Sequence, residues 1–101
     1  MEQYDLLARC AGFEWDEGNT GKIWRKHHVS PLECEQMFFN RPLVVADDLK
    51  HSTSEKRWYA LGRANAGREL FAVFTIRRGS IRLISARDMS REERREYRLH
   101  E

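Results

Sequence analysis

Residues 68–87 read RELFAVFTIRRGSIRLISAR and decide the fold of the chain. Two runs rich in apolar residues, 70–76 and 80–86, flank a turn at Gly79, a pattern typical of two antiparallel strands joined as a hairpin. Arg82 lies between two branched apolar residues, where a guanidinium group is costly unless it meets an anion or water. The stretch therefore predicts a hairpin at the centre of a small sheet, with one face suited to binding phosphate.

The other segments predict helices before this hairpin and one after it. Ser30-Pro31-Leu32-Glu33 is typical of a helix start, because Ser suits the N-cap, Pro the first helical position and Glu the third. Ser90-Arg91-Glu92-Glu93 repeats the capping pattern, and Tyr97 and Leu99 are the main apolar anchors of the helix after it. The remaining expected elements are a strand at 13–15, helices at 19–28 and 31–39, strands at 43–46 and 56–62, and a polar loop at 47–55.

This order of elements favours a single α+β domain over residues 1–101. Helices grouped before a run of strands suggest an antiparallel sheet of about four to five strands, with the two N-terminal helices on one face and another helix at the C-terminus. A chain of 101 residues is long enough for one modest core.

Loop lengths decide which face of the sheet carries the arginines. A two-residue turn at 78–79 and a three-residue loop at 65–67, with its glycine in the left-handed conformation, set both Arg82 and Arg57 opposite Thr75. A four-residue loop would break this grouping. With the shorter loops, one face is a core of Trp58, Ala72, Phe74, Ile76, Ile81 and Leu83, in which Trp58 lies opposite Phe74, and the other face holds Arg57, Thr75 and Arg82 at one end, with Tyr59, Val73 and Ile84 further along.

Composition and motif spacing argue against several classes of protein. The chain has 41% hydrophobic and 34% charged residues, and no apolar run approaches the roughly 20 residues that span a bilayer. The N-terminus lacks the basic-then-apolar order of a signal peptide, and Cys10 and Cys34 fit free thiols in a reducing cytosol. Neither Cys-x-x-Cys nor a zinc-type cluster of His and Cys occurs, so we expect no metal, no cofactor and no membrane contact.

The basic residues are unevenly distributed and are mostly arginines. Residues 1–50 contain six Lys and Arg against nine Asp and Glu, whereas residues 51–101 contain twelve against seven. Fourteen of the 18 basic residues are Arg, whose planar guanidinium group suits phosphate. An arginine-rich surface that is merely solvated is the alternative. The phosphate-binding candidates are Arg57, Arg68, Arg82 and Arg87.

Metal-free cleavage of RNA needs a base for the 2′-OH, cations for the charge on the phosphorus oxygens, and an acid for the leaving 5′ oxygen. The nucleophile is the 2′-OH, so RNA is cut and DNA is not. The polar loop ending at Glu55 and Arg57 offers a carboxylate and a cation, and the helix at 19–28 offers Lys22, Lys26 and His27. A solvated helix end, a loop tied down by its own ion pair, and passive nucleic-acid binding remain open alternatives.

Several short motifs occur in an order similar to that of one known family. They are Phe13-Glu14-Trp15-Asp16, Lys26-His27-x-Val29-Ser30, Glu33-x-Glu35-x-x-Phe38, His51-Ser52-x-x-Glu55-x-Arg57, Leu61-Gly62-Arg63, Gly67-Arg68, Phe74-Thr75, Ile81-Arg82-x-Ile84-Ser85-Ala86-Arg87, Glu93-Arg94 and Tyr97. Their order and spacing carry the match over residues 13–97. On these motifs the chain resembles the BrnT-type toxins, small RelE-like ribonucleases of type II toxin–antitoxin systems.

The resemblance implies a RelE-like α+β fold and an endoribonuclease that blocks translation. It also implies a BrnA-like ribbon-helix-helix antitoxin that covers the toxin, and operator DNA bound only through the antitoxin. By position, the family's functional residues fall on Lys26, His27, Glu55, Arg57, Arg68, Arg82 and Arg87. The chain departs from the pattern at Ile23, where many relatives have Asn, and at His28, where many have Gly.

The leading hypothesis is a metal-independent ribonuclease toxin of the bacterial cytoplasm. Its proton carrier is expected to be His27, with Glu55 as the rival base; Arg57, Arg82 and Arg68 are expected to bind the scissile phosphate, Lys22 and Lys26 the flanking RNA, and Arg87 further phosphate. A non-catalytic binding module that acts as a co-repressor is the alternative if no acid or base lies near the arginines. A structural domain of a larger assembly would instead show an exposed apolar patch and no clustered arginines.

Overall fold

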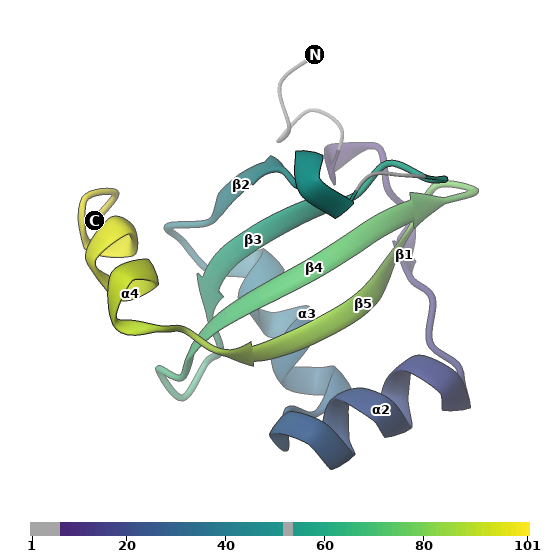
Figure 1. Cartoon of the computed structure of the whole chain (residues 1–101), viewed down its shortest axis with the longest axis horizontal. Coiled ribbons are helices and arrows are strands. Elements are labelled where there is room, and N and C mark those ends of the chain that lie inside the picture. Colours follow the sequence, from purple (N-terminus) through teal and green to yellow (C-terminus); the bar gives the residue numbers. More distant parts are fainter. Residues whose placement is uncertain (1–6, 52–53) are drawn as a thin grey trace.

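The sheet is built around β4 and β5, the two strands of the expected hairpin (Figure 1). The structure is a computed structural model and describes residues 7–51 and 54–101. The strand order is β1-β5-β4-β3-β2, with β1 parallel to β5 and the other neighbours antiparallel. In chain order the elements are β1 (Gly12–Phe13), α2 (Glu17–His27), α3 (Pro31–Phe39), β2 (Val44–Asp47), the 3₁₀ helix η1 (Leu49–His51), β3 (Trp58–Arg63), β4 (Glu69–Arg77), β5 (Ser80–Asp88) and α4 (Arg91–Arg98). The α+β class is confirmed; of the expected loop at 47–55, residues 52–53 lie outside the described residues.

The loop between β3 and β4 has the expected length and sets the expected register. The Ala64 N–H donates to the Arg68 carbonyl across three residues at 2.9 Å, and Gly67 has a φ of 95°. Thr75 pairs with Arg82, and the Trp58–Phe74 pair is also present. β3 begins one residue after Arg57, and the Thr75 hydroxyl donates to the carbonyl of residue 56 at 2.7 Å.

A β-bulge in β5 decides how the arginines of this strand are placed. The register shifts between Val73 and Phe74 of β4, which leaves Ile84 as the extra residue of β5. Because of the bulge, Leu83 and Ala86 are both fully buried in the same core, although strict alternation would put them on opposite faces. Arg82 and Arg87 therefore both point to the face of the sheet opposite the core.

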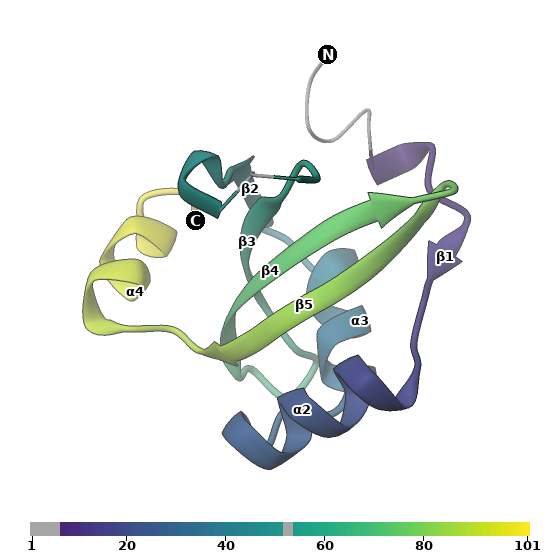
Figure 2. The same ribbon diagram turned by 45° about the vertical axis from the view of Figure 1, so that its right-hand side comes forward.

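Helices α2 and α3 pack on the core face of the sheet (Figure 2). Ile23 of α2 and Met37 and Phe38 of α3 pack with strand residues such as Phe74. The approach of α3 is close: a Cβ added at Gly62 would lie 2.9 Å from the Met37 carbonyl oxygen. The buried core residues are Ile23, Val29, Cys34, Met37, Phe38, Leu43, Ala60, Leu70, Ala72, Phe74, Ile81, Leu83 and Ala86.

The start of α2 lies two residues before the expected start at Asn19. Asp16 is the N-cap: its carboxylate accepts from the Asn19 N–H at 3.1 Å, while the Asn19 side chain accepts from the Asp16 N–H at 2.9 Å. The buried Asn19 amide also donates to the Leu83 carbonyl at 3.1 Å. This bond fixes the N-terminus of α2 beside the start of β5. At the other end, His28 adopts a left-handed conformation with a φ of 54°.

Helix α4 packs on the opposite face of the sheet, near the far end of β5 (Figure 1). Ser90 and Glu93 form the expected capping box. Tyr97 is the expected anchor: its ring is fully buried, and its hydroxyl donates to the Pro42 carbonyl at 2.6 Å. The expectation for Leu99 is wrong, because that side chain is 85% exposed. A single aromatic ring therefore provides most of the apolar contact of α4.

Candidate active site

Charged side chains gather on the face opposite the core, at the end of the sheet next to the β4–β5 turn. The group consists of Asp16, Arg82, Glu14, Arg77 and Glu55, which we call the charge chain. Arg82 and Arg77 come from the hairpin. Glu14 and Asp16 come from the segment between β1 and α2, and Glu55 comes from the segment before β3. Helices α2 and α3 pack on the core face of the sheet, and α4 packs near the far end of β5.

The charge chain alternates acidic and basic groups across adjacent strands. Arg82 donates to Glu14 and to Asp16, each at 2.9 Å, and its side chain is only 16% exposed. Arg77 lies 4.0 Å from the same Glu14 oxygen and contacts both oxygens of Glu55 at 3.3 Å. The Asn19 N–H lowers the pKa of the Asp16 carboxyl, and Arg82 lowers it further. The structure thus connects Glu55 and Arg82, two of the expected catalytic residues, through two residues that the sequence analysis did not select.

Arg57 and the loop before it lie at the same end of the sheet. The Arg57 carbonyl accepts from the Asp48 N–H at 2.9 Å, which joins the start of β3 to the segment after β2. The Asp48 carboxylate also lies 3.0 Å from Nδ1 of the His51 ring. The carboxylate beside His51 is thus Asp48, whereas Glu55 contacts Arg77.

The structure places His27 apart from the charge chain. Asp16 at the start of α2 contacts Arg82, whereas His27 is the last of the 11 residues of the helix. A helix of this length spans about 16 Å. Lys22 and Lys26 lie along the same helix with exposed side chains. The expected base His27 and the expected phosphate ligand Arg82 are thus at opposite ends of α2.

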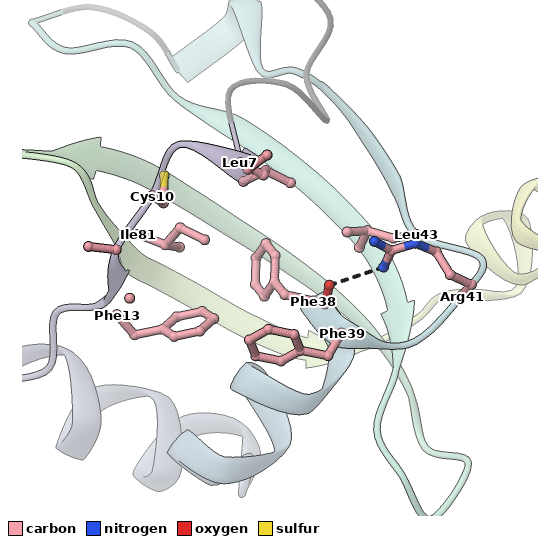
Figure 3. A pocket seen from close by; sticks show the side chains of 11 residues that line it. Leu7, Cys10, Phe13, Phe38, Phe39, Arg41, Leu43 and Ile81 are labelled. Carbon is pink, nitrogen blue, oxygen red and sulfur yellow. Dashed lines mark hydrogen bonds between the residues drawn. The ribbon is translucent and has the colours of Figure 1, made fainter.

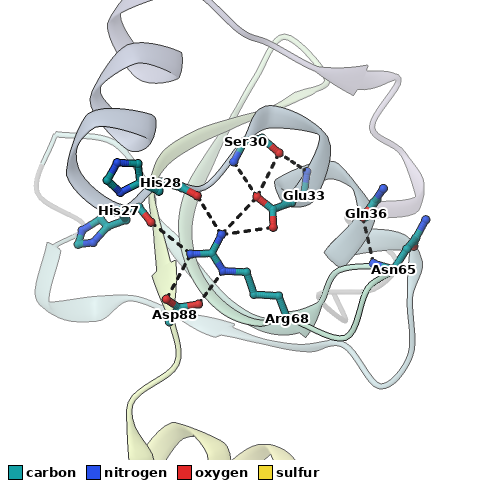
Figure 4. A network of polar contacts seen from close by, with 8 residues as sticks. All are labelled: His27, His28, Ser30, Glu33, Gln36, Asn65, Arg68 and Asp88. Atoms are coloured by element: carbon teal, nitrogen blue, oxygen red, sulfur yellow. Dashed lines mark hydrogen bonds and ion pairs between the residues drawn. The ribbon is translucent and has the colours of Figure 1, made fainter.

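Arg68 is placed at the junction of α2, α3 and β5 (Figure 4). It donates to both oxygens of Asp88 at 2.7 and 3.2 Å and to both oxygens of Glu33 at 3.3 Å. It also donates to the carbonyls of His28 at 2.9 Å and His27 at 3.2 Å, which end α2. A guanidinium group has five N–H donors, and these acceptors occupy all of them. To bind phosphate as expected, Arg68 would have to leave at least one of them.

Electrostatics reinforce this junction. The bond to Asp88 is the main reason why the pKa of Arg68 is raised, and Arg68 in turn lowers the pKa of Asp88. Burial alone would raise the pKa of Glu33, but the Ser30 backbone and Arg68 outweigh it, and the pKa is lowered. All three groups therefore stay charged at neutral pH.

Arg87 lies on the same face as Arg82 but next to α4. Its guanidinium group donates to both oxygens of Glu93 at 2.8 and 2.9 Å and lies 4.1 Å from the centre of the Phe71 ring. Phe71 in turn stacks on Tyr59 with ring centres 5.7 Å apart. Arg87 and Arg82 are five positions apart on β5, and one of the residues between them is the bulge residue Ile84. Arg82 therefore lies near the β4–β5 turn, whereas Arg87 lies beside Phe71 at the end of this face next to α4.

A second concave region lies between β1 and the end of α3, on the core side (Figure 3). This pocket has a volume of 410 Å³ and is lined mainly by apolar side chains, including Phe13, Phe38 and the 74% exposed Phe39. Its one lining arginine, Arg41, donates to the Phe38 carbonyl at 3.2 Å. The pocket holds no pair of acidic and basic side chains, so acid–base chemistry is better supported at the charge chain.

The described residues contain no group of three or more His, Cys, Asp or Glu side chains placed to hold a metal ion. In the same part of the chain, no helix is long and apolar enough to cross a membrane. Neither Cys10 nor Cys34 forms a disulfide within the described residues, and burial raises the pKa of the Cys34 thiol to about 12.

Comparison with known families assigns the chain to a family of toxins. A family model described as the ribonuclease toxin BrnT of type II toxin–antitoxin systems matches residues 15–93. The class of protein is thus a small α+β ribonuclease toxin, for which RNA is the substrate and an antitoxin the partner. The chain belongs to the BrnT family of these toxins. No curated protein matches it.

Two residues of the charge chain, Glu14 and Arg77, escaped the sequence analysis. A signal for each was present. Glu14 follows Phe13, a core residue, so alternation turns it to the face of Arg82. Arg77 is two residues beyond Thr75 and shares its face for the same reason.

Proposed function

We propose that this toxin is a metal-independent endoribonuclease that inhibits translation by cutting RNA, and that its active site is the end of the sheet with the charge chain. The observation that carries this proposal is the connection of Glu55 to Arg82 through adjacent ion pairs on a face that α2 and α3 leave uncovered. A carboxylate beside guanidinium groups supplies a proton acceptor and phosphate ligands in one place.

Glu55 is the base in this proposal. It takes the proton of the 2′-OH, the 2′ oxygen forms a bond to phosphorus, and the bond from phosphorus to the 5′ oxygen breaks. Arg82 and Arg57 bind the non-bridging oxygens, whose negative charge increases in the transition state. The 5′ oxygen leaves with a proton that solvent water supplies, and the products are a 2′,3′-cyclic phosphate and a 5′-hydroxyl.

The position of His27 favours Glu55 over it as the base. A base must come within hydrogen-bond reach of the proton that it removes. His27 lies one helix length from Arg82, whereas Glu55 contacts a neighbour of Arg82. In this proposal Lys22, Lys26 and His27 contact RNA that flanks the cleaved bond. Arg87, which lies next to α4 on the face that carries the charge chain, contacts further RNA.

The experiment that tests the proposal is cleavage of a purified RNA in EDTA, with and without ribosomes. We expect wild-type protein to cut, Arg82→Ala and Glu55→Gln to lose at least about a hundredfold in rate, and His27→Ala to lose much less. Arg95→Ala, an exposed arginine on α4, is the matched control. A loss confined to His27→Ala would assign the base to the histidine. A folded wild type that cuts neither substrate would favour the non-catalytic co-repressor.

For the partner, we propose a BrnA-like ribbon-helix-helix antitoxin, and operator DNA that is bound only through it in the bacterial cytoplasm. The family supports an antitoxin, and the uncovered charged face offers it a surface. Co-expression should yield a complex that shifts operator DNA in a gel, whereas the toxin alone should not. A DNA shift by the toxin alone would contradict this arrangement.

A further inference from the structure

One carboxylate oxygen lies between the two guanidinium groups of the hairpin. Glu14 Oε1 is 2.9 Å from Nη1 of Arg82 and 4.0 Å from Nη1 of Arg77. Among the described residues, the Glu14 carboxylate contacts only these two groups. A phosphate oxygen bound by two arginines would occupy an equivalent place.

We propose that Arg77 and Arg82 form a phosphate-binding subsite, and that Glu14 fills this subsite until the backbone of the RNA displaces it. The inference rests on the proposed function and adds two residues to it: Arg77 as a further phosphate ligand and Glu14 as an internal competitor. It makes Glu14 a determinant of RNA affinity rather than of the chemical step.

Displacement of Glu14 requires only a side-chain rotation. Its backbone is held, because its N–H donates to the Ile81 carbonyl at 2.8 Å and its carbonyl accepts from the Asn19 amide at 3.3 Å. The side chain is 41% exposed and that of Arg77 is 46% exposed, so solvent screens their interaction and makes it easily replaced. A phosphate group carries its charge on oxygens that can contact both guanidinium groups at once.

Arg82 needs no rearrangement to receive the phosphate. Its other amino group, Nη2, contacts Asp16 at 2.9 Å, and Asp16 is itself held as the N-cap of α2. The guanidinium group therefore remains oriented after Glu14 leaves. Asp16 is a positioning residue in this arrangement, and Glu14 is the exchangeable one.

The exchange also affects the proposed base. In the free protein Arg77 contacts both oxygens of Glu55 at 3.3 Å. When Arg77 turns toward phosphate, at least one Glu55 oxygen loses its partner and becomes able to accept the proton of a 2′-OH. Binding of the correct backbone is thereby coupled to release of the base.

The test is the binding of a fluorescent 2′-O-methyl RNA, which lacks the nucleophile and cannot be cleaved, measured by anisotropy at several salt concentrations. Glu14→Gln should bind about three- to tenfold more tightly than wild type, because two solvent-screened ion pairs no longer compete. Glu92→Gln removes the same charge from an exposed site on α4 and should leave affinity unchanged within about twofold. Arg77→Gln should bind more weakly and reduce the salt slope by about one ion.

A double variant separates competition from a general charge effect. If Glu14 acts through the subsite, Glu14→Gln should gain little affinity in the Arg77→Gln background. Equal gains in Glu14→Gln and Glu92→Gln, or a full gain without Arg77, would overturn the inference. Because cleavage is measured separately, normal cutting with no gain in Glu14→Gln refutes the subsite alone. Absence of both RNA binding and cutting in every folded variant refutes the proposed function and the inference together.

Discussion

Replacement of Arg68 by alanine should destabilise the fold strongly, although the sequence suggests a phosphate-binding arginine at this position. Its side chain is 27% exposed and connects the carbonyl end of α2 to Glu33 in the first turn of α3 and to Asp88 at the end of β5. Removal leaves the last carbonyls of α2 and Oε2 of Glu33 without the Arg68 donor, whereas Oε1 of Glu33 still accepts from Ser30. Near Arg68, only apolar contacts would then hold α2 and α3 against the sheet.

The magnitude follows from the exposure of each partner. The Asp88 side chain is 57% exposed, so that ion pair contributes at most about 1 kcal/mol. Glu33 is 29% exposed, and its contacts and the two carbonyl contacts together add roughly 1–2 kcal/mol. We therefore expect Arg68→Ala to lower the free energy of unfolding by about 2–3 kcal/mol, or to lower Tm by roughly 10–20 °C.

Thermal and urea unfolding followed by circular dichroism measure this change. Arg68→Lys keeps the charge but not the planar fork, so it should recover less than half of the loss. Arg95→Ala, with an exposed side chain on α4, should stay within about 0.5 kcal/mol of wild type. If Arg68→Ala also stays within that limit, the desolvation of Arg68 offsets its contacts and the reasoning fails.

Three further changes test other parts of the fold. Acid should remove the contribution of Asp88 to the free energy of unfolding. Because Arg68 lowers the pKa of Asp88 in the folded protein, this contribution is present above the unfolded pKa and is lost as the pH falls through the folded pKa. Acid titrations should therefore show a smaller loss of stability in Arg68→Ala than in wild type. Gly62→Ala should cost about 1–3 kcal/mol in urea unfolding, because its Cβ would lie 2.9 Å from the Met37 carbonyl oxygen; a neutral result would mean that α3 shifts freely. Tyr97→Phe should cost about 0.5–1.5 kcal/mol through the lost hydroxyl bond, and an unchanged Tm would show that water replaces it.

The central sheet could be predicted because its signals are local. The apolar runs on either side of Gly79 and the glycine at 67 specify strands, turns and loop lengths, and those lengths set the register of β3, β4 and β5. The bulge at Ile84 could not be predicted, since it depends on how Leu83 and Ala86 both pack under the helices. The sequence predicts a strand at 13–15, but β1 spans only Gly12–Phe13, and its parallel pairing with β5 has no local signal in the sequence.

The candidate site could be predicted only in part, because an arginine in a sequence carries no information about its partner. The register places Arg82 opposite Thr75 as expected, whereas Glu55 is joined to this end of the sheet by its contact with Arg77, which the sequence does not indicate. His27 precedes a left-handed residue at the end of α2, and its distance from Arg82 depends on the direction in which α2 runs along β5. That direction is fixed by a buried amide at the start of the helix, which has no apolar signal.

The arginines of the second half illustrate why charge count alone is a poor guide to RNA binding. Arg68 and Arg87 each contact carboxylates through two or more donors, and Arg98 pairs with Glu69 beneath α4. These pairs join elements of the fold and need not open for a ligand. Arg82 differs, because Glu14 accepts from it through a single N–H, while its other partner, Asp16, is held as the N-cap of α2. In the proposed subsite, a phosphate-binding arginine is thus distinguished by how easily its carboxylate partner can leave, and that partner is visible only in the structure.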